Sequence, residues 1–280
     1  MKEYLKSLLK KLNLYHPLQS AYREVRDQIR IQSLRITYAK HATTQPPLFQ
    51  CNFCGATYRK FVPEYPTPDI SPAINNNHVI AGFGENVYCP SCLSKNRERL
   101  LKAVLEQQSI AGKNILHFSP EKHLHRFITT KGAVTTVDLT PGFYHNIDSS
   151  VRYADATSLP FADSSFDLLI ANHILEHIPE DQTAMKEMYR VLASSGFAIL
   201  QVPYSETLNT TIEEPFINDP VRQAALFGQK DHVRIYSKAD YIRRLQQAGF
   251  EVSVLSPEAL APFRIYAIQE NECVFLCHKR

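Results

Sequence analysis

Four cysteines occur as two CxxC pairs, a spacing that allows two thiolates to bind one metal ion. The pairs are Cys51 with Cys54 and Cys89 with Cys92. Four thiolates suit a closed, tetrahedral structural zinc site. The pairs are further apart than in common zinc fingers, so we expect an inserted loop over residues 60–85. Zinc binding is worth roughly 10–16 kcal/mol in small modules, enough to stabilise a segment with few apolar runs. The spacing therefore predicts a structural zinc ion rather than incidental cysteines.

A second group of chemically capable residues lies in one polar segment, FGQKDHVRIY, from Phe227 to Tyr236. The side chains that could bind a polar substrate are Gln229, Asp231, His232, Arg234 and Tyr236. Because the segment lies in a long connection between a predicted strand and a predicted helix, it is well placed to bind an acceptor. An ordinary loop that leads into a helix would use the same residue types. The sequence leaves both interpretations open.

The elements that must position these residues alternate between strand and helix beyond residue 94. Hydrophobic periodicity predicts helices at 95–107, 121–130, 180–193 and 238–248, strands at 114–119, 134–139, 166–172, 197–203, 250–255 and 272–278, and a strand or loop at 151–156. Repeated strand–helix units predict a Rossmann-like, mostly parallel α/β sheet with helices on both faces and a ligand site at the carboxyl ends of its strands. Pro257 and Pro262 leave no helix before the last strand, which predicts an antiparallel C-terminal edge strand.

The chain divides by composition into a basic, amphipathic helical arm at 1–42, a zinc-ribbon-like segment at 43–94 and an α/β domain at 95–280. Residues 1–50 carry nine Lys or Arg and three acidic residues, a net charge of +6, which leaves −3 for the rest of a chain whose total is +3. An acidic α/β domain disfavours wrapping around nucleic acid, so only the arm is expected to contact a polyanion or a membrane surface. We expect the arm to pack on its own protein or on a partner.

Neither a signal peptide nor an apolar run long enough to span a membrane is found in the sequence, which predicts a soluble, cytoplasmic protein. Disulfides are rare in that reducing compartment. The last two cysteines, Cys273 and Cys277, have a spacing poorly suited to a metal and are expected to be buried thiols.

The phrases LHFSPE, LPFADSSFD, HILEHIPED and FGQKDHVRIY, together with the preceding CPxC, resemble class I S-adenosylmethionine-dependent methyltransferases of type 11. The resemblance covers about two thirds of the chain and implies that 95–280 is a methyltransferase domain that binds S-adenosylmethionine. It implies that Asp138, followed by Leu139, accepts hydrogen bonds from the ribose hydroxyls, because a carboxylate is an acceptor with two oxygens. Asp155 and Ala156 match the family's adenine contact.

The same resemblance implies that Asn172 and His173 line the methyl-donor pocket. It also implies a cofactor loop at residues 117–121, after the first strand, where the family usually has an acidic residue and a glycine-rich turn. Here the loop has no glycine and consists of His117, Phe118, Ser119, Pro120 and Glu121. We expect Pro120 to start the next helix, whose free N–H groups could bind the cofactor carboxylate while Glu121 binds its ammonium group. The alternative is a degenerate loop in a non-catalytic descendant of the family.

Methyl transfer from a sulfonium requires alignment rather than a nucleophilic side chain, but a hydroxyl or amine acceptor must lose a proton. His173 and His232 are the candidate bases, whereas His177 is expected to cap or pack at the following helix. Three functions remain: a methyltransferase for a small-molecule or glycan-like polar acceptor, an RNA methyltransferase that uses the zinc knuckles and the arm, and a non-catalytic, zinc-stapled scaffold.

Overall fold

The computed structural model describes residues 15–46 and 48–279. The first fourteen residues of the predicted arm lie outside the described residues. Among the residues that are described, no helix combines the length and the apolar character needed to cross a membrane.

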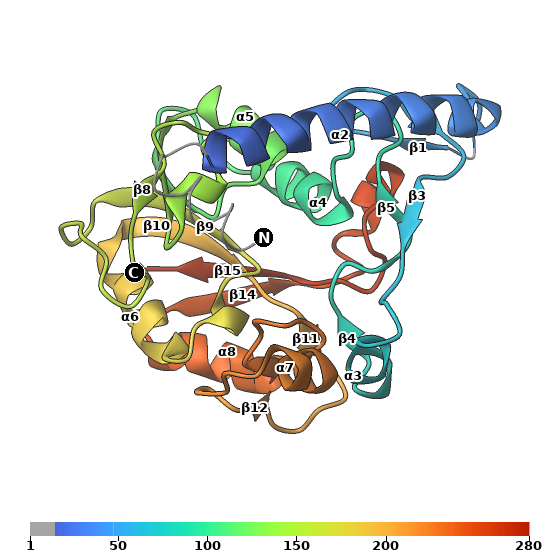
Figure 1. Ribbon diagram of the computed structural model, residues 1–280. Helices are drawn as coiled ribbons and strands as arrows, with labels where there is room; N and C mark the ends of the chain where they lie inside the picture. Colours follow the sequence, from blue (N-terminus) through green and yellow to red (C-terminus); the bar gives the residue numbers. More distant parts are fainter. Residues whose placement is uncertain (1–14, 47, 280) are drawn as a thin grey trace.

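A seven-stranded sheet forms the centre of the molecule (Figure 1). Its strand order is β14-β15-β10-β9-β6-β7-β8, and the pairs among β10, β9, β6, β7 and β8 are all parallel. The strands are β6 (Asn114–Phe118), β7 (Ala133–Asp138), β8 (Arg152–Tyr153), β9 (Phe166–Asn172), β10 (Leu192–Gln201), β14 (Glu251–Leu255) and β15 (Val274–His278). The predicted Rossmann-like, mostly parallel sheet is therefore confirmed.

Helices cover both faces of this sheet, because alternate strand residues point to opposite sides. Leu116, Leu169 and Leu200 share a buried cluster with residues of α6 and α8, whereas Ile115, Ile170 and Ile199 share another with residues of α4 and α5. In Figure 1, α4 and α5 lie above the strands and α6 and α8 lie below them. The helices are α4 (Asn96–Leu105), α5 (Lys122–Thr129), α6 (Asp181–Val191) and α8 (Lys238–Gln247).

The C-terminal strand β15 is antiparallel, as predicted, but its expected position at the edge of the sheet is wrong. It lies between β14 and β10 and pairs with both. The reason is its composition, since Val274 and Leu276 are buried on one face while Phe275 and Cys277 are buried on the other. A strand that is apolar on both faces gains most from two neighbours. The edge belongs to β14, where buried and exposed residues alternate. Cys273 and Cys277 are buried free thiols, as expected.

The segment between the two cysteine pairs carries regular structure instead of the simple loop expected at 60–85. Its strand β4 (Val79–Ile80) pairs with β11 (Tyr204–Ser205) of the α/β region, in a small sheet of order β12-β13-β11-β4. The other elements in and around this segment are β1 (Phe49–Gln50), β2 (Thr57–Tyr58), β3 (Val62–Glu64), α3 (Ser71–Asn76), β5 (Gly84–Tyr88), β12 (Ile212–Glu213), α7 (Pro220–Phe227) and β13 (Arg234–Ser237). The predicted boundary near residue 94 is thus bridged by a shared sheet.

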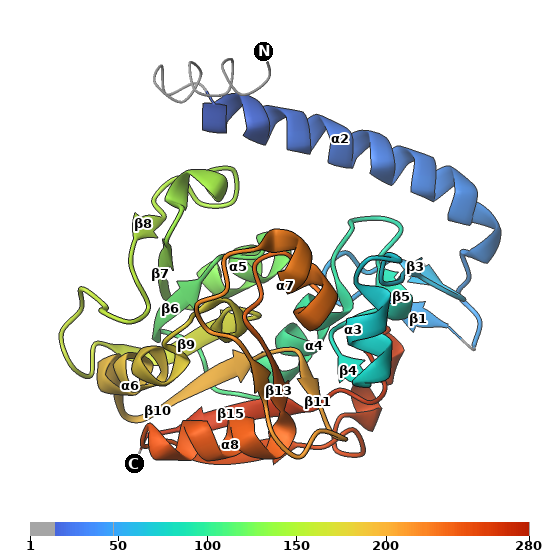
Figure 2. The ribbon, with the colours of Figure 1, turned by 60° about the horizontal axis from the view of Figure 1, so that its bottom comes forward.

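The N-terminal helix α2 (Tyr15–Tyr38) runs as a long rod along one side of the molecule (Figure 2). It is followed by a short 3₁₀ turn, Ala39–His41. Three further 3₁₀ turns occur at Pro141–Phe143, Leu175–His177 and Ala261–Tyr266. Arginines and Tyr38 of α2 contact the rest of the molecule: Arg23 lies over the ring of Phe143, Arg30 lies over that of Tyr88, and Tyr38 packs against the cluster that includes Cys51. The described part of the arm therefore packs on its own protein, one of the expected alternatives.

Candidate cofactor pocket and cysteine cluster

The four predicted metal ligands, Cys51, Cys54, Cys89 and Cys92, come together in space. Their Sγ atoms all lie within 4.8 Å of one another. The two pairs have the same backbone turn: the N–H of Gly55 donates to the carbonyl of Cys51 at 2.8 Å, and that of Leu93 donates to Cys89 at 2.9 Å. Gly55 and Leu93 both adopt positive φ, which closes each turn around its thiols. Two equivalent knuckles thus present four sulfur atoms to one point.

The guanidinium group of Arg99, on α4, lies beside this cluster and is completely buried. It donates hydrogen bonds to the carbonyls of Asn86, Val87 and Ser94 in the cysteine segment, and to those of Tyr266 and Ala267 near the C-terminus. Burial lowers the pKa of Arg99, and the neighbouring Cys51 and Cys89 oppose that shift. One cation therefore joins the cysteine segment to two other parts of the chain.

A cavity of about 810 Å³, the larger of two described below, opens at the carboxyl ends of β6, β7 and β9. We call it the larger cavity throughout. This is the end of a parallel α/β sheet at which ligands bind, and the volume is typical of a small-molecule site. Most predicted cofactor-binding residues line it: Phe118, Ser119, Pro120, Glu121, Asp138, Leu139, Asp155, Ala156, Asn172 and His173.

His117 is the exception among the predicted cofactor residues. Its side chain is fully buried and does not line the larger cavity. The ring stacks on that of His125, with centroids 6.1 Å apart. Burial lowers the pKa of His117 to about 4, so the ring is neutral at physiological pH. A neutral, enclosed imidazole packs as part of the interior, and the prediction of a cofactor contact at His117 is wrong.

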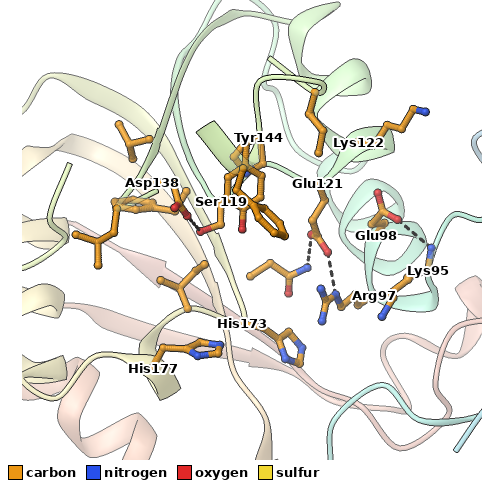
Figure 3. A pocket seen from close by; sticks show the side chains of 18 of the residues that line it. Lys95, Arg97, Glu98, Ser119, Glu121, Lys122, Asp138, Tyr144, His173 and His177 are labelled. Carbon is orange, nitrogen blue, oxygen red and sulfur yellow. Dashed lines mark hydrogen bonds and ion pairs between the residues drawn. The ribbon is translucent and has the colours of Figure 1, made fainter. Parts of the chain in front are cut away.

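The glycine-free loop after β6 adopts the conformation that a glycine would allow. Ser119 has a φ of +46°, in the left-handed region. Its hydroxyl donates to Oδ2 of Asp138 at 2.5 Å, a contact that compensates for part of the backbone strain (Figure 3). Helix α5 begins at Lys122 with Glu121 as its N-cap residue, so Pro120 precedes the cap and is not the first helical residue as expected.

Glu121 points into the larger cavity and is held from two sides (Figure 3). Arg97 Nε donates to one carboxylate oxygen at 2.8 Å and Asn172 Nδ2 donates to the other at 2.6 Å. Burial opposes ionisation of Glu121, but Arg97 and Asn172 outweigh it and hold the pKa below its usual value. The cavity therefore contains a fixed carboxylate beside a fixed guanidinium.

Glu98, which follows Arg97 on α4, accepts a hydrogen bond from the N-terminal turn of α5. Its two carboxylate oxygens accept from the N–H groups of Lys95, at 2.9 Å, and His123, at 3.1 Å. Burial, and next the nearby Glu121, raise the pKa of Glu98 to about 7. The helix N–H groups expected to bind a cofactor carboxylate are thus partly used by the protein itself.

Asp138 ends β7 at the opposite side of the cavity from Arg97 (Figure 3). Besides the Ser119 hydroxyl, it accepts a 2.6 Å hydrogen bond from the N–H of Thr140. Tyr144 lines the cavity near it, and its pKa is raised to about 12 by burial and then by the Asp138 charge. Asp155 accepts two hydrogen bonds from Thr157, which fix its loop.

Comparisons with known proteins match this part of the chain. Residues 120–200 match a family model described as a methyltransferase domain. Over these residues the chain is similar to methyltransferase domains. The match spans the cavity loops from Pro120 to β10, and so includes Asp138, Asp155 and Asn172.

The individual relatives of this chain are distant. The chain is 27% identical over 156 residues to the uncharacterized methyltransferase YcgJ of Bacillus subtilis, which covers 55% of this chain and 56% of that protein. It is 30% identical over 139 residues to malonyl-[acyl-carrier protein] O-methyltransferase of Halorhodospira halophila, covering 46% and 44%. The chain spans about half or less of the length of the first curated relatives it matches.

Two solved structures also align with this chain at low sequence identity. The YcgJ protein of Bacillus subtilis aligns with a TM-score of 0.45 at 15% identity, over 66% of this chain and 99% of that one. The [4+2]-cyclase SpnF aligns with a TM-score of 0.49 at 16% identity, over 79% and 99%.

The polar segment predicted to bind an acceptor is divided between the surface and the interior of the α/β region. Asp231 lines the larger cavity, whereas Gln229 and His232 line a second, smaller cavity of about 290 Å³. His232 is nearly buried, which lowers its pKa to about 4, and it does not reach the larger cavity. As a base for an acceptor in the larger cavity, His232 is therefore a wrong prediction.

Arg234 and Tyr236 bind the protein itself rather than a substrate. Arg234 is 1% exposed and donates to the carbonyls of Leu175, Ile178 and Pro179 and to Glu213. The hydroxyl of Tyr236, which is fully buried, donates to Asp181 at 2.7 Å. Their hydrogen-bonding groups support the turn before α6, so both substrate-binding predictions are corrected.

Sequence reasoning missed the residues that helices α2 and α4 contribute to the cavity. Arg97 and Glu98 of α4 line it, as do Arg26, Asp27 and Arg30 of α2. Hydrophobic periodicity identified both helices but said nothing about their polar faces. The only sequence signal was position, because α4 starts four residues after the second cysteine pair and must lie near its knuckle.

Replacement of Arg97 by Met is expected to lower the free energy of unfolding by about 1–3 kcal/mol, because it leaves Glu121 with one donor in a largely enclosed site. Urea denaturation followed by circular dichroism measures the loss. Arg222→Met is the matched control: Arg222 pairs with Glu214 at 2.7 Å on the surface, and its loss should cost less than about 1 kcal/mol. Equal losses in the two variants would contradict the structural role given to Arg97.

Proposed function

We propose that the protein is an S-adenosylmethionine-dependent methyltransferase whose acceptor is a small-molecule or glycan-like polar compound. The observation that carries this proposal is the Asp138 carboxylate at the carboxyl end of β7, in a cavity of suitable volume. A carboxylate there can accept hydrogen bonds from both ribose hydroxyls. The match of residues 120–200 to a methyltransferase family model supports the same assignment.

The remaining residues of the larger cavity fit the two ends of the cofactor. Asp155 and the N–H of Ala156 would bind the adenine base next to the ribose. At the other end, Glu121 would bind the ammonium group of the methionine half and Arg97 its carboxylate, since these fixed charges are complementary to that zwitterion. Ser119 would allow close approach of the backbone because its φ is positive.

When bound, S-adenosylmethionine supplies an activated methyl group on a sulfonium. The protein then has to align the acceptor and accept its proton. His173 lines the larger cavity, and burial, followed by the charge of Arg97, lowers its pKa, so that the ring is neutral and able to accept a proton near pH 7. His173 is therefore the proposed general base.

The contacts of α2 favour a small acceptor over RNA. Arg23, Arg30 and Arg35 of this helix are engaged with Phe143, Tyr88 and the carbonyl of Ser91, respectively. Arg26 pairs with its neighbour Asp27. Since α2 also lines the larger cavity, it would limit the size of the acceptor. RNA binding through α2 would instead require arginines free to contact phosphates.

We further propose that the four-cysteine cluster binds a structural zinc ion, within a zinc-ribbon-like segment at 43–94 that is followed by the methyltransferase domain at 95–280. Four thiolates around Zn²⁺ carry a net charge of −2, and the buried guanidinium of Arg99 would offset part of it. The ring of His123 contacts the carbonyl of Cys92 at 2.8 Å and supports the second knuckle.

Calorimetric titration with S-adenosylhomocysteine tests the cofactor assignment. We expect saturable binding by the wild-type chain and a loss of at least about tenfold in affinity for Asp138→Ala, because the ribose hydroxyls lose their charged acceptor. Asp163→Ala is the matched control: Asp163 is an exposed aspartate paired with Arg190 outside the cavity, and its removal should leave binding unchanged. Absence of heat with the wild-type chain would refute the proposed function.

Metal analysis tests the cysteine cluster. Cys54→Ser should lose about one zinc ion per chain and lower the melting temperature, because one of four ligands is removed. Cys54 is exposed, so the change itself creates no cavity in the core. Cys277→Ser, at a buried thiol outside the cluster, should keep its zinc even if it is less stable. Zinc content that is the same in both variants would contradict the proposed site.

A further inference from the structure

A buried carboxylate without a hydrogen-bond donor lies in the wall between the two cavities. Glu176, in the 3₁₀ turn Leu175–His177 that follows β9, is 0% exposed. Neither Oε1 nor Oε2 has a hydrogen-bond partner among the described residues. An isolated buried carboxylate is costly, so a buried anion normally has a cation or several donors against it. Glu176 therefore requires a positively charged partner.

Three imidazole rings surround one oxygen of this carboxylate. Oε1 lies 3.5 Å from Nδ1 of His173, 3.9 Å from Nε2 of His177 and 3.8 Å from Nε2 of His232. None of these three contacts qualifies as a hydrogen bond. The rings of His177 and His232 meet edge to face with their centroids 4.6 Å apart. The nitrogens thus lie around the oxygen without bonding to it.

The second nitrogen of two of these rings is already committed. Nδ1 of His177 lies 3.3 Å from the carbonyl oxygen of Asp231, and Nδ1 of His232 lies 3.3 Å from that of Phe227. Because a carbonyl oxygen only accepts, each Nδ1 carries the hydrogen. In a neutral imidazole the Nε2 lone pair then faces Oε1 of Glu176. Both atoms are hydrogen-bond acceptors, so no hydrogen bond can form between them.

The guanidinium groups on neighbouring elements are committed to other anions. Arg97 is paired with Glu121 at 2.8 Å, and Arg234 is paired with Glu213 at 3.0 Å. Arg244 is shared between Glu213, Asp181 and Asp240. These guanidinium groups therefore do not neutralise Glu176, whereas a metal ion from solution would bind both imidazole nitrogens and the carboxylate oxygen.

We propose that Glu176, His177 and His232 form a binding site for a divalent transition-metal ion, with Zn²⁺ as the representative species. Their ligand atoms lie within 4.8 Å of one another. Imidazole nitrogens with one carboxylate suit zinc and its first-row neighbours, whereas Ca²⁺ and Mg²⁺ prefer oxygen ligands. Donation of the other ring N–H to a carbonyl is the usual support for a histidine ligand. Bonds of about 2.0–2.1 Å would draw the three side chains slightly together.

The site shares no ligand with the cysteine cluster, whereas its carboxylate lies 3.5 Å from Nδ1 of His173, the proposed general base. Glu176, His177 and His232 line the smaller cavity, and His177 also lines the larger one, so an ion there can be reached from either side. Three protein ligands leave at least one coordination position for water or for a ligand in a cavity. The ligands come from the turn after β9 and from the connection before β13, which the ion would hold together.

Cobalt titration of the full chain, after removal of its metals, tests the proposal. We expect about two Co²⁺ ions per wild-type chain: one with the intense thiolate-to-cobalt charge-transfer band of the cysteine cluster, and a second with d–d absorption only. Glu176→Gln and His232→Ala should each lose the second ion and keep the first. His145→Ala, at an exposed histidine outside both cavities, is the matched control and should bind both ions.

Thermal unfolding provides a second readout, in which the change on adding Zn²⁺ to each variant controls for differences in its stability. With the second site empty, Glu176→Gln should melt no lower than the wild-type chain, because it removes an unpaired buried charge. Added Zn²⁺ should then raise the melting temperature of the wild-type chain but not that of Glu176→Gln. A single metal equivalent in the wild-type chain, or a second ion retained by both variants, would overturn the proposal.

Discussion

The buried guanidinium group of Arg99 is the interaction on which the arrangement of the molecule depends. It satisfies five main-chain carbonyls, three in the cysteine segment and two near the C-terminus, and has no carboxylate partner among the described residues. A group with five fixed donors can hold three stretches of chain in one geometry. Because Arg99 lies in the first turn of α4, its hydrogen bonds fix that turn. Arg97 and Glu98 belong to the same turn and reach the cavity loops.

The consequence is a cavity whose charged groups are arranged before a ligand arrives. Arg97 holds Glu121, Glu98 caps α5, and Ser119 joins the first loop to Asp138. Preorganised polar groups cost less to order on binding than mobile ones. This hydrogen bond explains why the loop can do without glycine. Ser119 has a strained φ of +46°, and its hydroxyl offsets part of that strain by donating to Asp138, which a glycine could not do.

Local patterns were sufficient to predict the parts of the structure that depend on local physics. Alternation of apolar residues located the strands of the main sheet, and the two CxxC spacings located the cysteine cluster. The position of β15 could not be predicted from its own residues, because strand order depends on partners far along the chain. The pairing of β4 with β11 was missed for the same reason.

The contacts of polar residues were harder to predict from the sequence, because the residue type alone does not show whether a side chain binds a ligand or its own protein. Arg234, Tyr236 and His117 look like site residues in the sequence but are enclosed by their own protein. Arg97 looks like an ordinary charged residue on a helix but lies in the cavity. No feature of the sequence predicted that Glu176 is buried. Whether a polar group meets a ligand or a main-chain carbonyl is decided by tertiary packing.

The central claim is that the larger cavity binds S-adenosylmethionine with its ribose on Asp138. A crystal structure with S-adenosylhomocysteine tests it most directly. We expect the ribose hydroxyls within hydrogen-bond distance of the Asp138 carboxylate, the adenine beside Asp155, and the amino-acid end between Glu121 and Arg97. A ligand bound elsewhere, or one in the cavity whose ribose makes no contact with Asp138, would contradict it.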